Sequence, residues 1–350
     1  MNATLRRDVL EAFVGQLIGG KRTLLSNRSI ARAFRAIERR RSFDALDLHE
    51  RMLADSVRMG AYHAAIQRYV SVQDFVVDIG TGTGILAFFA ARKGPRKIYA
   101  IDESKTMLEY ARAAAAANSI DNLTFVASSS RKFQPKEPID VIVQEQMGVA
   151  LFDEGMIDSI LDVRDRCLKP HGRILPDKFD FYLEPIQLHE QERVPMIQEQ
   201  RFHGVAFPPP LTEPESTYRF REIRPEQIEF MLCDPLPVFT FDLSTLAREE
   251  LPKHFSVSKP VVHQGQLDGI CMYFKATFDD DIWFSTGPGA RKTHWPMLVY
   301  RTPALAFDPG ELFAMRVETP DLTEYLDWSW HIGVQAATLP PCRAGALNTL

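Results

Sequence analysis

The chain has 350 residues, of which 45% are hydrophobic and 25% are charged, so it is long enough for about two globular domains. Its formal net charge of -5 argues against a nucleic-acid-binding protein and favours cationic partners over acidic ones. Its 4 cysteines lie far apart and favour neither a zinc site nor a disulfide framework, and no apolar run is long enough to cross a membrane. We therefore expect a soluble, cytoplasmic protein without a metal.

The first 70 residues are predicted to be helical. Apolar side chains recur at helical spacing in residues 5–18 and again in residues 30–37. A group of arginines lies in and after the second stretch. They are Arg32, Arg35, Arg39, Arg40 and Arg41. Because acidic residues are interleaved with them, we interpret this surface as a solvated or dimer-facing helix face rather than a nucleic-acid patch.

Residues 74–175 alternate β-rich runs with helical runs, which predicts parallel strands joined by crossover helices. The predicted strands are Phe75–Ile79, Lys97–Ile101, Leu123–Val126 and Ile139–Val143. The alanine-rich residues 107–117 predict a helix between two of them. From Pro176 onward β-type runs dominate and predict a second, antiparallel domain. These runs are residues 179–183, 238–243 and 271–278.

A glycine-rich loop, Gly80-Thr81-Gly82-Thr83-Gly84, follows the first predicted strand. A helix is predicted to begin with residues Ile85 to Ala91, so the glycines occupy a strand-to-helix turn. Glycine there allows a ligand to approach the backbone closely and permits the positive φ that a tight turn needs. The loop also fits a dinucleotide site, because Gly82-x-Gly84-x-x-Ala87 has the G-x-G-x-x-A form.

Two acids near the loop favour S-adenosylmethionine over a dinucleotide. Asp78 lies at the end of the strand, where its charge would repel a pyrophosphate and would suit the cationic amino-acid part of S-adenosylmethionine. Asp102 ends the next predicted strand and is placed to hold the ribose hydroxyls of either cofactor. The prediction is a methyltransferase. The alternatives are a dinucleotide-dependent oxidoreductase and a catalytically silent binding module.

Four segments, in the same order, resemble the protein arginine methyltransferase family over residues 43–330. Residues 145–154 resemble its paired-glutamate loop, with Glu145 and Glu154 as the pair, and Thr293-His294-Trp295 resembles its THW loop. The other two are residues 77–86, which resemble its first motif, and residues 48–58, a helix that resembles the segment before the cofactor fold.

The resemblance implies a seven-stranded, Rossmann-like α/β methyltransferase domain followed by an antiparallel β-barrel domain. The implied boundaries are 1–45 for an N-terminal helical extension, 46–175 for the methyltransferase domain, 176–335 for the barrel and 336–350 for a tail. The implied cofactor is S-adenosyl-L-methionine, its product is S-adenosyl-L-homocysteine, and the implied assembly is a homodimer.

The resemblance also implies roles for single residues. Arg58 would hold the cofactor carboxylate and Met52 would lie near the sulfonium. His294 would pair with Asp55 and brace the THW loop. The cofactor-binding candidates are Met52, Arg58, Asp78, Gly80, Thr81, Gly82, Gly84, Asp102, Glu103, Ser129, Ser130 and Glu145. The catalytic candidates are Glu145, Glu154, His294 and Asp55, and the substrate-binding candidates are Glu145, Met147, Glu154, His294 and Trp295.

A pair of carboxylates suits a guanidinium as methyl acceptor. The guanidinium has a pKa above about 12 and delocalised lone pairs, so this group is a poor nucleophile until one of its nitrogens is oriented. One glutamate can accept two parallel N–H hydrogen bonds from the guanidinium. The other polarises the attacking nitrogen and receives its proton. Gly148, between Glu145 and Glu154, gives the backbone the freedom to turn both acids toward one point.

The chain departs from the family at four places, which we expect to change the acceptor rather than the reaction. They are residues 39–43 in place of a tyrosine-rich motif, Gln146 and Val149 in the glutamate loop, residues 129–131 where an adenine-binding acid is usual, and the proline-rich residues 190–215 in place of a helical dimerisation arm. We hypothesise that free L-arginine is monomethylated, as in bacterial small-molecule relatives, with the N-terminal arginines binding its carboxylate. Arginine in proteins is the alternative acceptor.

Overall fold

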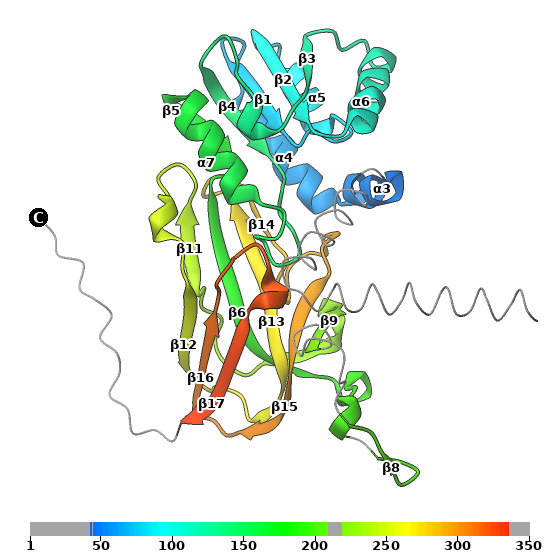
Figure 1. Cartoon of the computed structure of the whole chain (residues 1–350), viewed down its shortest axis with the longest axis vertical. Helices are drawn as coiled ribbons and strands as arrows, with labels where there is room; N and C mark the ends of the chain where they lie inside the picture. Colours follow the sequence, from blue (N-terminus) through cyan, green and yellow to red (C-terminus); the bar gives the residue numbers. More distant parts are fainter. Residues whose placement is uncertain (1–42, 44, 200, 209–218, 336–350) are drawn as a thin grey trace, which may run out of the picture. The chain divides into compact units, whose positions relative to one another are not determined.

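The computed structural model describes residue 43 and residues 45–199, 201–208 and 219–335 (Figure 1). The predicted helices of residues 5–18 and 30–37, the arginine cluster and the tail 336–350 lie outside these residues. The chain forms two compact units. The first contains the residues up to Glu145 together with Asp162–Leu175, and the second contains Gln146–Leu161, Pro176–Phe207 and the residues from Glu215 onward.

A parallel five-stranded sheet forms the centre of the first unit. Its strands are β1 (Phe75–Ile79), β2 (Lys97–Asp102), β3 (Leu123–Ala127), β4 (Ile139–Gln144) and β5 (Leu168–Leu175), in the order β3-β2-β1-β4-β5. The middle strands are nearly continuous apolar runs, as a sheet covered on both faces requires. Strand order reverses between β1 and β4, and open α/β sheets bind ligands at the carboxyl ends of the strands beside such a reversal.

The Rossmann-like fold class is confirmed, but the expected strand count of seven is wrong. Among the described residues this sheet has five strands, because the chain enters β6 (Lys178–Leu188) after β5 and β6 pairs with strands of the second unit. Burial alternates along the first half of β6, which suits an antiparallel sheet with one buried face.

The described residues contain five α-helices. They are α3 (Leu46–Ala54), α4 (Ser56–Tyr69), α5 (Ile85–Ala91), α6 (Lys105–Ala117) and α7 (Met156–Cys167). α5 packs on β1 and β2, and α6 packs on β2 and β3. The predicted continuous helix over residues 48–58 is wrong, because Asp55 has an extended backbone and its carboxylate accepts hydrogen bonds from the amides of Val57 and Arg58. Asp55 therefore ends α3 and caps α4.

The second unit is antiparallel, as predicted, and consists of two main sheets and a hairpin. Its larger sheet has seven strands, with the path β10-β6-β13-β15-β9 and with β11 on β6 and β14 on β13. The bounds are β9 (Phe220–Ile223), β10 (Ile228–Met231), β11 (Phe239–Asp242), β13 (Gly265–Thr277), β14 (Trp283–Ser285) and β15 (Met297–Phe307). The smaller sheet contains β12 (His254–Pro260), β16 (Leu312–Glu318) and β17 (Ser329–Gln335).

Aromatic side chains pack the two sheets of this unit against each other. The ring of Phe181 on β6 lies 5.6 Å from that of Phe255 on β12 and 6.2 Å from that of Trp328. Phe181 is fully buried. This apolar core gives the unit its barrel-like character, although its strands form two separate sheets.

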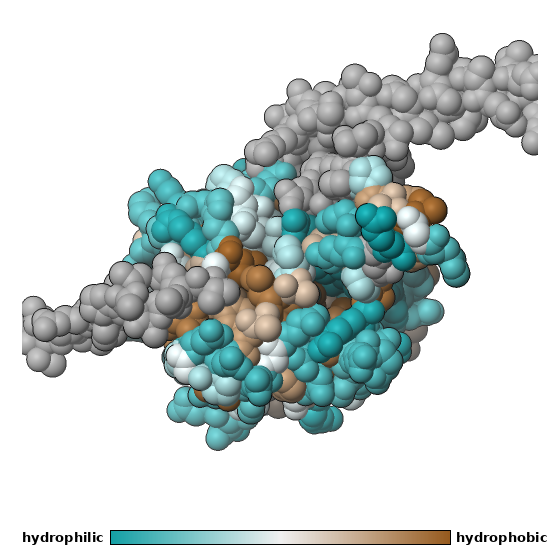
Figure 2. Space-filling model, turned by 90° about the horizontal axis from the view of Figure 1, so that it is seen from below, coloured by the Kyte–Doolittle hydropathy of each residue, from teal (hydrophilic) through white to brown (hydrophobic). Residues whose placement is uncertain are grey.

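The residues between β6 and β9, called here the arm segment (residues 189–208), contain no α-helix among those described. They form the short 3-10 turns Glu190–Glu192 and Ile197–Glu199 and a hairpin of β7 (Arg201–Phe202) and β8 (Val205–Ala206). Phe202, Val205 and Phe207 are exposed on it. Figure 2 views the molecule from the end that carries β8 and shows apolar residues gathered in the middle of that face.

Candidate active site

The glycine loop has the conformation that its sequence predicts. Gly80, Gly82 and Gly84 have φ angles of 71°, 52° and 87°, which L side chains rarely adopt. The amides of Gly80 and Thr81 donate to the carbonyl of Ile101 at 3.0 and 2.9 Å, so the loop is tied to the end of β2. A Cβ on Gly84 would lie 2.6 Å from the ring of Phe88. These glycines are therefore required by backbone conformation and by close packing.

Asp78 is buried beneath this loop. One oxygen of its carboxylate accepts hydrogen bonds from the Thr81 hydroxyl at 2.6 Å and from the Ala87 amide at 3.1 Å. The other oxygen has no partner among the described residues. Burial raises the pKa of Asp78 from 3.8 to about 7, and the hydrogen bond from Thr81 opposes this rise. Asp78 thus braces the loop and keeps one carboxylate oxygen without a donor.

Asp102 and His49 both lie beside the loop at Gly82. Asp102 accepts hydrogen bonds from the amides of Gly82 at 2.9 Å and Ser104 at 2.8 Å. Burial raises the pKa of Asp102, and the hydrogen bonds from the Ser104 and Gly82 amides oppose this rise. A Cβ on Gly82 would lie 3.0 Å from Cε1 of His49, which is itself buried on α3. The sequence analysis missed His49, although it precedes Met52 by one helical turn and so lies on the same face of α3.

Arg58 and Glu145 form a buried ion pair. Nη1 of Arg58 donates to Oε2 of Glu145, and the two side chains are only 3% and 6% exposed. Glu145 follows β4 directly, and β4 pairs with β1 so that Gln144 lies opposite Ile79. The first catalytic glutamate candidate and the glycine loop therefore share the carboxyl edge of the sheet. Nε of Arg58 has no partner in the described part of the chain.

Tyr62 supports the same edge and was also missed. Its side chain is fully buried on α4, and its hydroxyl donates to the Gln144 carbonyl at 2.6 Å. Burial raises the pKa of Tyr62 well above its usual value, so it stays a neutral donor. It lies one helical turn after Arg58, so α4 fixes the end of β4 through two successive turns.

The second unit holds the rest of the glutamate loop. The indole Nε1 of Trp295 donates to the carbonyl of Met147 at 2.7 Å, so the THW segment and the glutamate loop are joined directly. Trp295 is buried and stacks on Phe284 at 5.6 Å. His294 packs against Trp295 with a ring distance of 3.9 Å.

Gly148 and Asp153 shape this loop. Asp153 accepts a hydrogen bond from the Ala150 amide at 3.0 Å, and a Cβ on Gly148 would lie 2.1 Å from the same carboxylate oxygen. Glycine is therefore needed for close approach to Asp153. Glu154 and His294 belong to the second unit, whereas Glu145 and Asp55 belong to the first. The pairing of the two glutamates and the pairing of His294 with Asp55 stay predictions.

The remaining cofactor-binding candidates belong to the first unit, and their roles in binding the cofactor stay predictions. Met52 is half-buried on α3, and Glu103 is exposed after β2. Ser129 and Ser130 are half-buried at the start of the 3-10 turn Ser130–Lys132, and Arg166 donates to the Ser130 carbonyl at 2.9 Å. No group of three or more metal-ligating side chains occurs within the described ranges. Nor does any helix in those ranges have the length and apolarity needed to cross a membrane.

Residues 76–172 match the family described as a methyltransferase domain, and residues 219–328 match the arginine methyltransferase oligomerization subdomain. The chain is 30% identical over 287 residues to protein arginine N-methyltransferase 1 of Dictyostelium discoideum, which covers 77% of this chain and 81% of that protein. It is 31% identical over 282 residues to protein arginine N-methyltransferase 6 of Xenopus tropicalis, with coverages of 78% and 83%. The chain belongs to the protein arginine methyltransferase family. A solved structure of this family, the Trypanosoma brucei PRMT1 enzyme-prozyme heterotetrameric complex with AdoHcy, matches with a TM-score of 0.71 and 25% identity over 85% of this chain and 96% of that one.

Membership of the protein arginine methyltransferase family confirms the prediction of an S-adenosylmethionine-dependent arginine N-methyltransferase. The dinucleotide-dependent oxidoreductase, which the glycine pattern had left open, loses its support. Family membership does not decide between free arginine and arginine in a protein as the acceptor.

Proposed function

We propose that this protein transfers a methyl group from S-adenosylmethionine to the guanidinium of an arginine side chain in a protein. The observation that carries the proposal is the position of Glu145, which is paired with Arg58 at the same sheet edge as the glycine loop. Matched relatives are named protein arginine N-methyltransferases, which favours this acceptor over free L-arginine. The arginines that would bind the carboxylate of free arginine lie outside the described residues.

The residues around the loop fit the cofactor. The glycines leave the space that a Cβ would fill, and Asp102 ends the neighbouring strand, where its carboxylate could also accept from ribose hydroxyls. Arg58 keeps donors beyond Nη1, including Nε, which has no partner among the described residues, so it can bind a carboxylate without releasing Glu145. The bound cofactor would supply the electrophilic methyl group.

Glu145 would then act on the acceptor. An ion pair with Arg58 holds the Glu145 carboxylate in one orientation, so it can accept hydrogen bonds from the guanidinium. Glu154 would supply the second carboxylate and take up the proton that the methylated nitrogen releases. Negative charge at this site also offsets the repulsion between two cationic reactants.

The acceptor can be tested with labelled cofactor. An arginine-containing peptide and free L-arginine would be offered at equal concentration, and products would be separated by mass spectrometry, with Glu145→Gln as the inactive control. We expect label in the peptide alone. Label in free arginine alone would restore the free-arginine hypothesis, and the masses of the products would distinguish one methyl group from two.

We also propose that the protein self-associates through its arm segment. Three large apolar side chains are exposed at the β7-β8 hairpin. Phe202 is 46% exposed, Val205 is 57% exposed and Phe207 is 42% exposed. Clustered apolar side chains of this size favour an interface with another protein surface. The matched family region is described as an oligomerization subdomain.

A further inference from the structure

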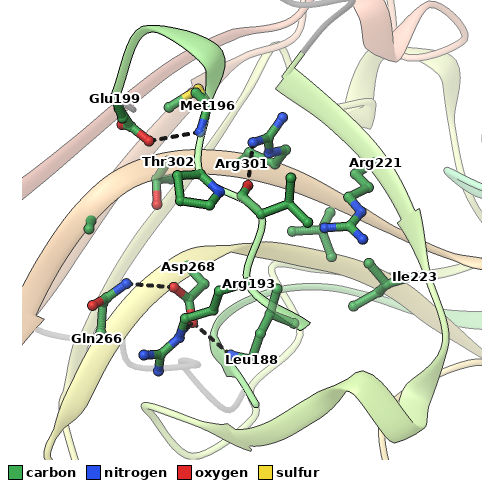
Figure 3. A pocket seen from close by; sticks show the side chains of 14 residues that line it. Leu188, Arg193, Met196, Glu199, Arg221, Ile223, Gln266, Asp268, Arg301 and Thr302 are labelled. Atoms are coloured by element: carbon green, nitrogen blue, oxygen red, sulfur yellow. Dashed lines mark hydrogen bonds and ion pairs between the residues drawn. The ribbon is translucent and has the colours of Figure 1, made fainter. Parts of the chain in front are cut away.

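A pocket of about 120 Å³ lies within the second unit, at the base of the arm segment. Its walls come from the arm segment and from β9, β13 and β15, and Figure 3 shows their side chains around a common space. It shares no residue with the candidate active site. Three arginines, Arg193, Arg221 and Arg301, line it together with the carboxylates of Glu199 and Asp268.

Both carboxylates are already engaged. Asp268 accepts hydrogen bonds from Nε of Arg193 at 2.9 Å and from the Leu188 amide at 2.8 Å. Glu199 accepts from the Met196 amide at 3.0 Å. Arg193 and Asp268 therefore neutralise each other, and the lining as a whole carries one positive charge in excess.

Arg221 is the cation best placed to receive a ligand. Its Nη1 donates a long hydrogen bond of 3.4 Å to the backbone carbonyl of Glu192. Among the described residues no carboxylate pairs with it. It extends from β9 at the side of the pocket that faces the arm segment (Figure 3). A guanidinium of this kind presents a planar fork that matches a carboxylate.

Thr302 supplies a second, independent indication of a polar ligand. The residue is 6% exposed and lines the pocket, and its Oγ1 has no hydrogen-bond partner within the described part of the chain. A buried hydroxyl without a partner is unfavourable, and such groups are uncommon in folded proteins. A ligand oxygen in the pocket would satisfy it.

The rest of the lining is apolar. Leu188, Ile223 and Val299 belong to the buried core of this unit, and Met196 is 2% exposed. A ligand must therefore combine an anionic group with an apolar body. The single excess positive charge favours a monoanion over a dianion such as phosphate.

We propose that this pocket binds a small monocarboxylate with an apolar body, held by Arg221 and Thr302. The Arg221 guanidinium pairs with the carboxylate, the Thr302 hydroxyl bonds to one of its oxygens, and the apolar body packs on Ile223, Val299 and Met196. Val194 and Pro195 also line the pocket, so the ligand lies against the start of the arm segment. The proposal is independent of the methyl acceptor.

Titration calorimetry on the full chain tests the proposal with isovalerate as the ligand. We expect saturable binding in the millimolar range or tighter, and at least tenfold weaker binding of the neutral isovaleramide, since it keeps the shape and loses the charge. Arg221→Gln should weaken isovalerate binding about tenfold or more, and Thr302→Val, which preserves volume, by a few fold. Arg224→Gln, an exposed neighbour outside the pocket, should leave it unchanged.

Four results would each overturn the proposal. One is equal binding of isovalerate and isovaleramide. Another is unchanged affinity in both pocket variants, each verified as folded by circular dichroism. The third is tighter binding of inorganic phosphate than of isovalerate, and the fourth is the absence of saturable isovalerate binding.

Discussion

Glu145 and Glu154 carry the proposed chemistry, and conservative substitutions separate their role from cofactor binding. Glu145→Gln or Glu154→Gln should lower turnover by about a hundredfold or more, because the amide neither takes up the proton nor offsets the acceptor's charge. Affinity for S-adenosylhomocysteine, measured by calorimetry, should change by no more than a few fold.

Glu109→Gln on the exposed face of α6 is the matched control and should leave both quantities unchanged. If turnover persists in both site variants, the assignment of the two glutamates is wrong.

Asp78 should make stability depend on pH. In the folded protein the pKa of Asp78 is about 7, whereas in the unfolded chain it has the ordinary value of 3.8. The folded state therefore binds more protons than the unfolded state in this range, and the free energy of unfolding falls as pH rises, by up to about 4 kcal/mol for this group. Asp78→Asn should flatten the dependence, as measured by urea unfolding at about pH 5 and about pH 8. An unchanged slope in the variant would show that Asp78 ionises normally.

Much of the loop could be predicted at the level of single residues, because glycine spacing reports directly on backbone conformation. All three spaced glycines have positive φ, and Asp78 and Asp102 lie at the ends of their strands. His49 and Tyr62 were missed because each contributes through a tertiary contact, with Gly82 and with the Gln144 carbonyl, and no local pattern encodes such contacts.

At the scale of elements, apolar strands were predicted well and irregular ones were not. The predicted strand Phe75–Ile79 has the bounds of β1, and the helix predicted to begin at Ile85 is α5, which starts at that residue. β5 was not predicted because it contains Pro170 and Gly172, which disfavour strands, and it forms through pairing with β4 at the edge of the sheet. The break between α3 and α4 was missed although aspartate is a favoured N-cap, because the prediction did not consider that Asp55 could cap a second helix through the Val57 and Arg58 amides.

Gly60 offers a stabilising substitution in α4. A Cβ at this exposed helical position would meet nothing within 4 Å. Gly60→Ala should therefore raise the free energy of unfolding by about 1 kcal/mol, because alanine restricts the unfolded chain more than glycine does. Gly172→Ala on β5 should destabilise instead, since its Cβ would lie 2.5 Å from the Leu168 side chain. Urea unfolding of both variants checks this contrast. It is refuted if both substitutions change the free energy of unfolding in the same direction.

A buried ion pair connects the two sheets of the second unit. Nζ of Lys259 on β12 lies 2.5 and 2.6 Å from the two oxygens of Glu184 on β6, and the Glu184 side chain is fully buried. Lys259→Met should destabilise the protein by about 3–5 kcal/mol, because it leaves a buried carboxylate without its cation.

Adding Glu184→Leu to Lys259→Met should recover part of this loss, because the charge is then removed as well. Arg316→Gln, which breaks an exposed pair with Glu318, should have little effect. The idea fails if the single and double variants unfold at the same urea concentration.

At the scale of the whole molecule, the arm segment should determine the oligomeric state. Val205→Asp places a charge among the exposed apolar residues of the β7-β8 hairpin and should shift the protein toward monomer in sedimentation velocity. Val262→Asp, at an exposed valine outside the arm segment, should not. A wild-type protein that is monomeric at all concentrations would remove the basis for the proposed self-association.

The path of the chain between its two units limits how the protein can be divided. Residues 146–161 belong to the second unit, although the residues on either side of them belong to the first. A single cut after Leu175 would leave the second unit without Met147, whose carbonyl receives the Trp295 indole. A chimera that takes its antiparallel unit from a relative must therefore also take that relative's residues for 146–161, or the glutamate loop will lose its anchor.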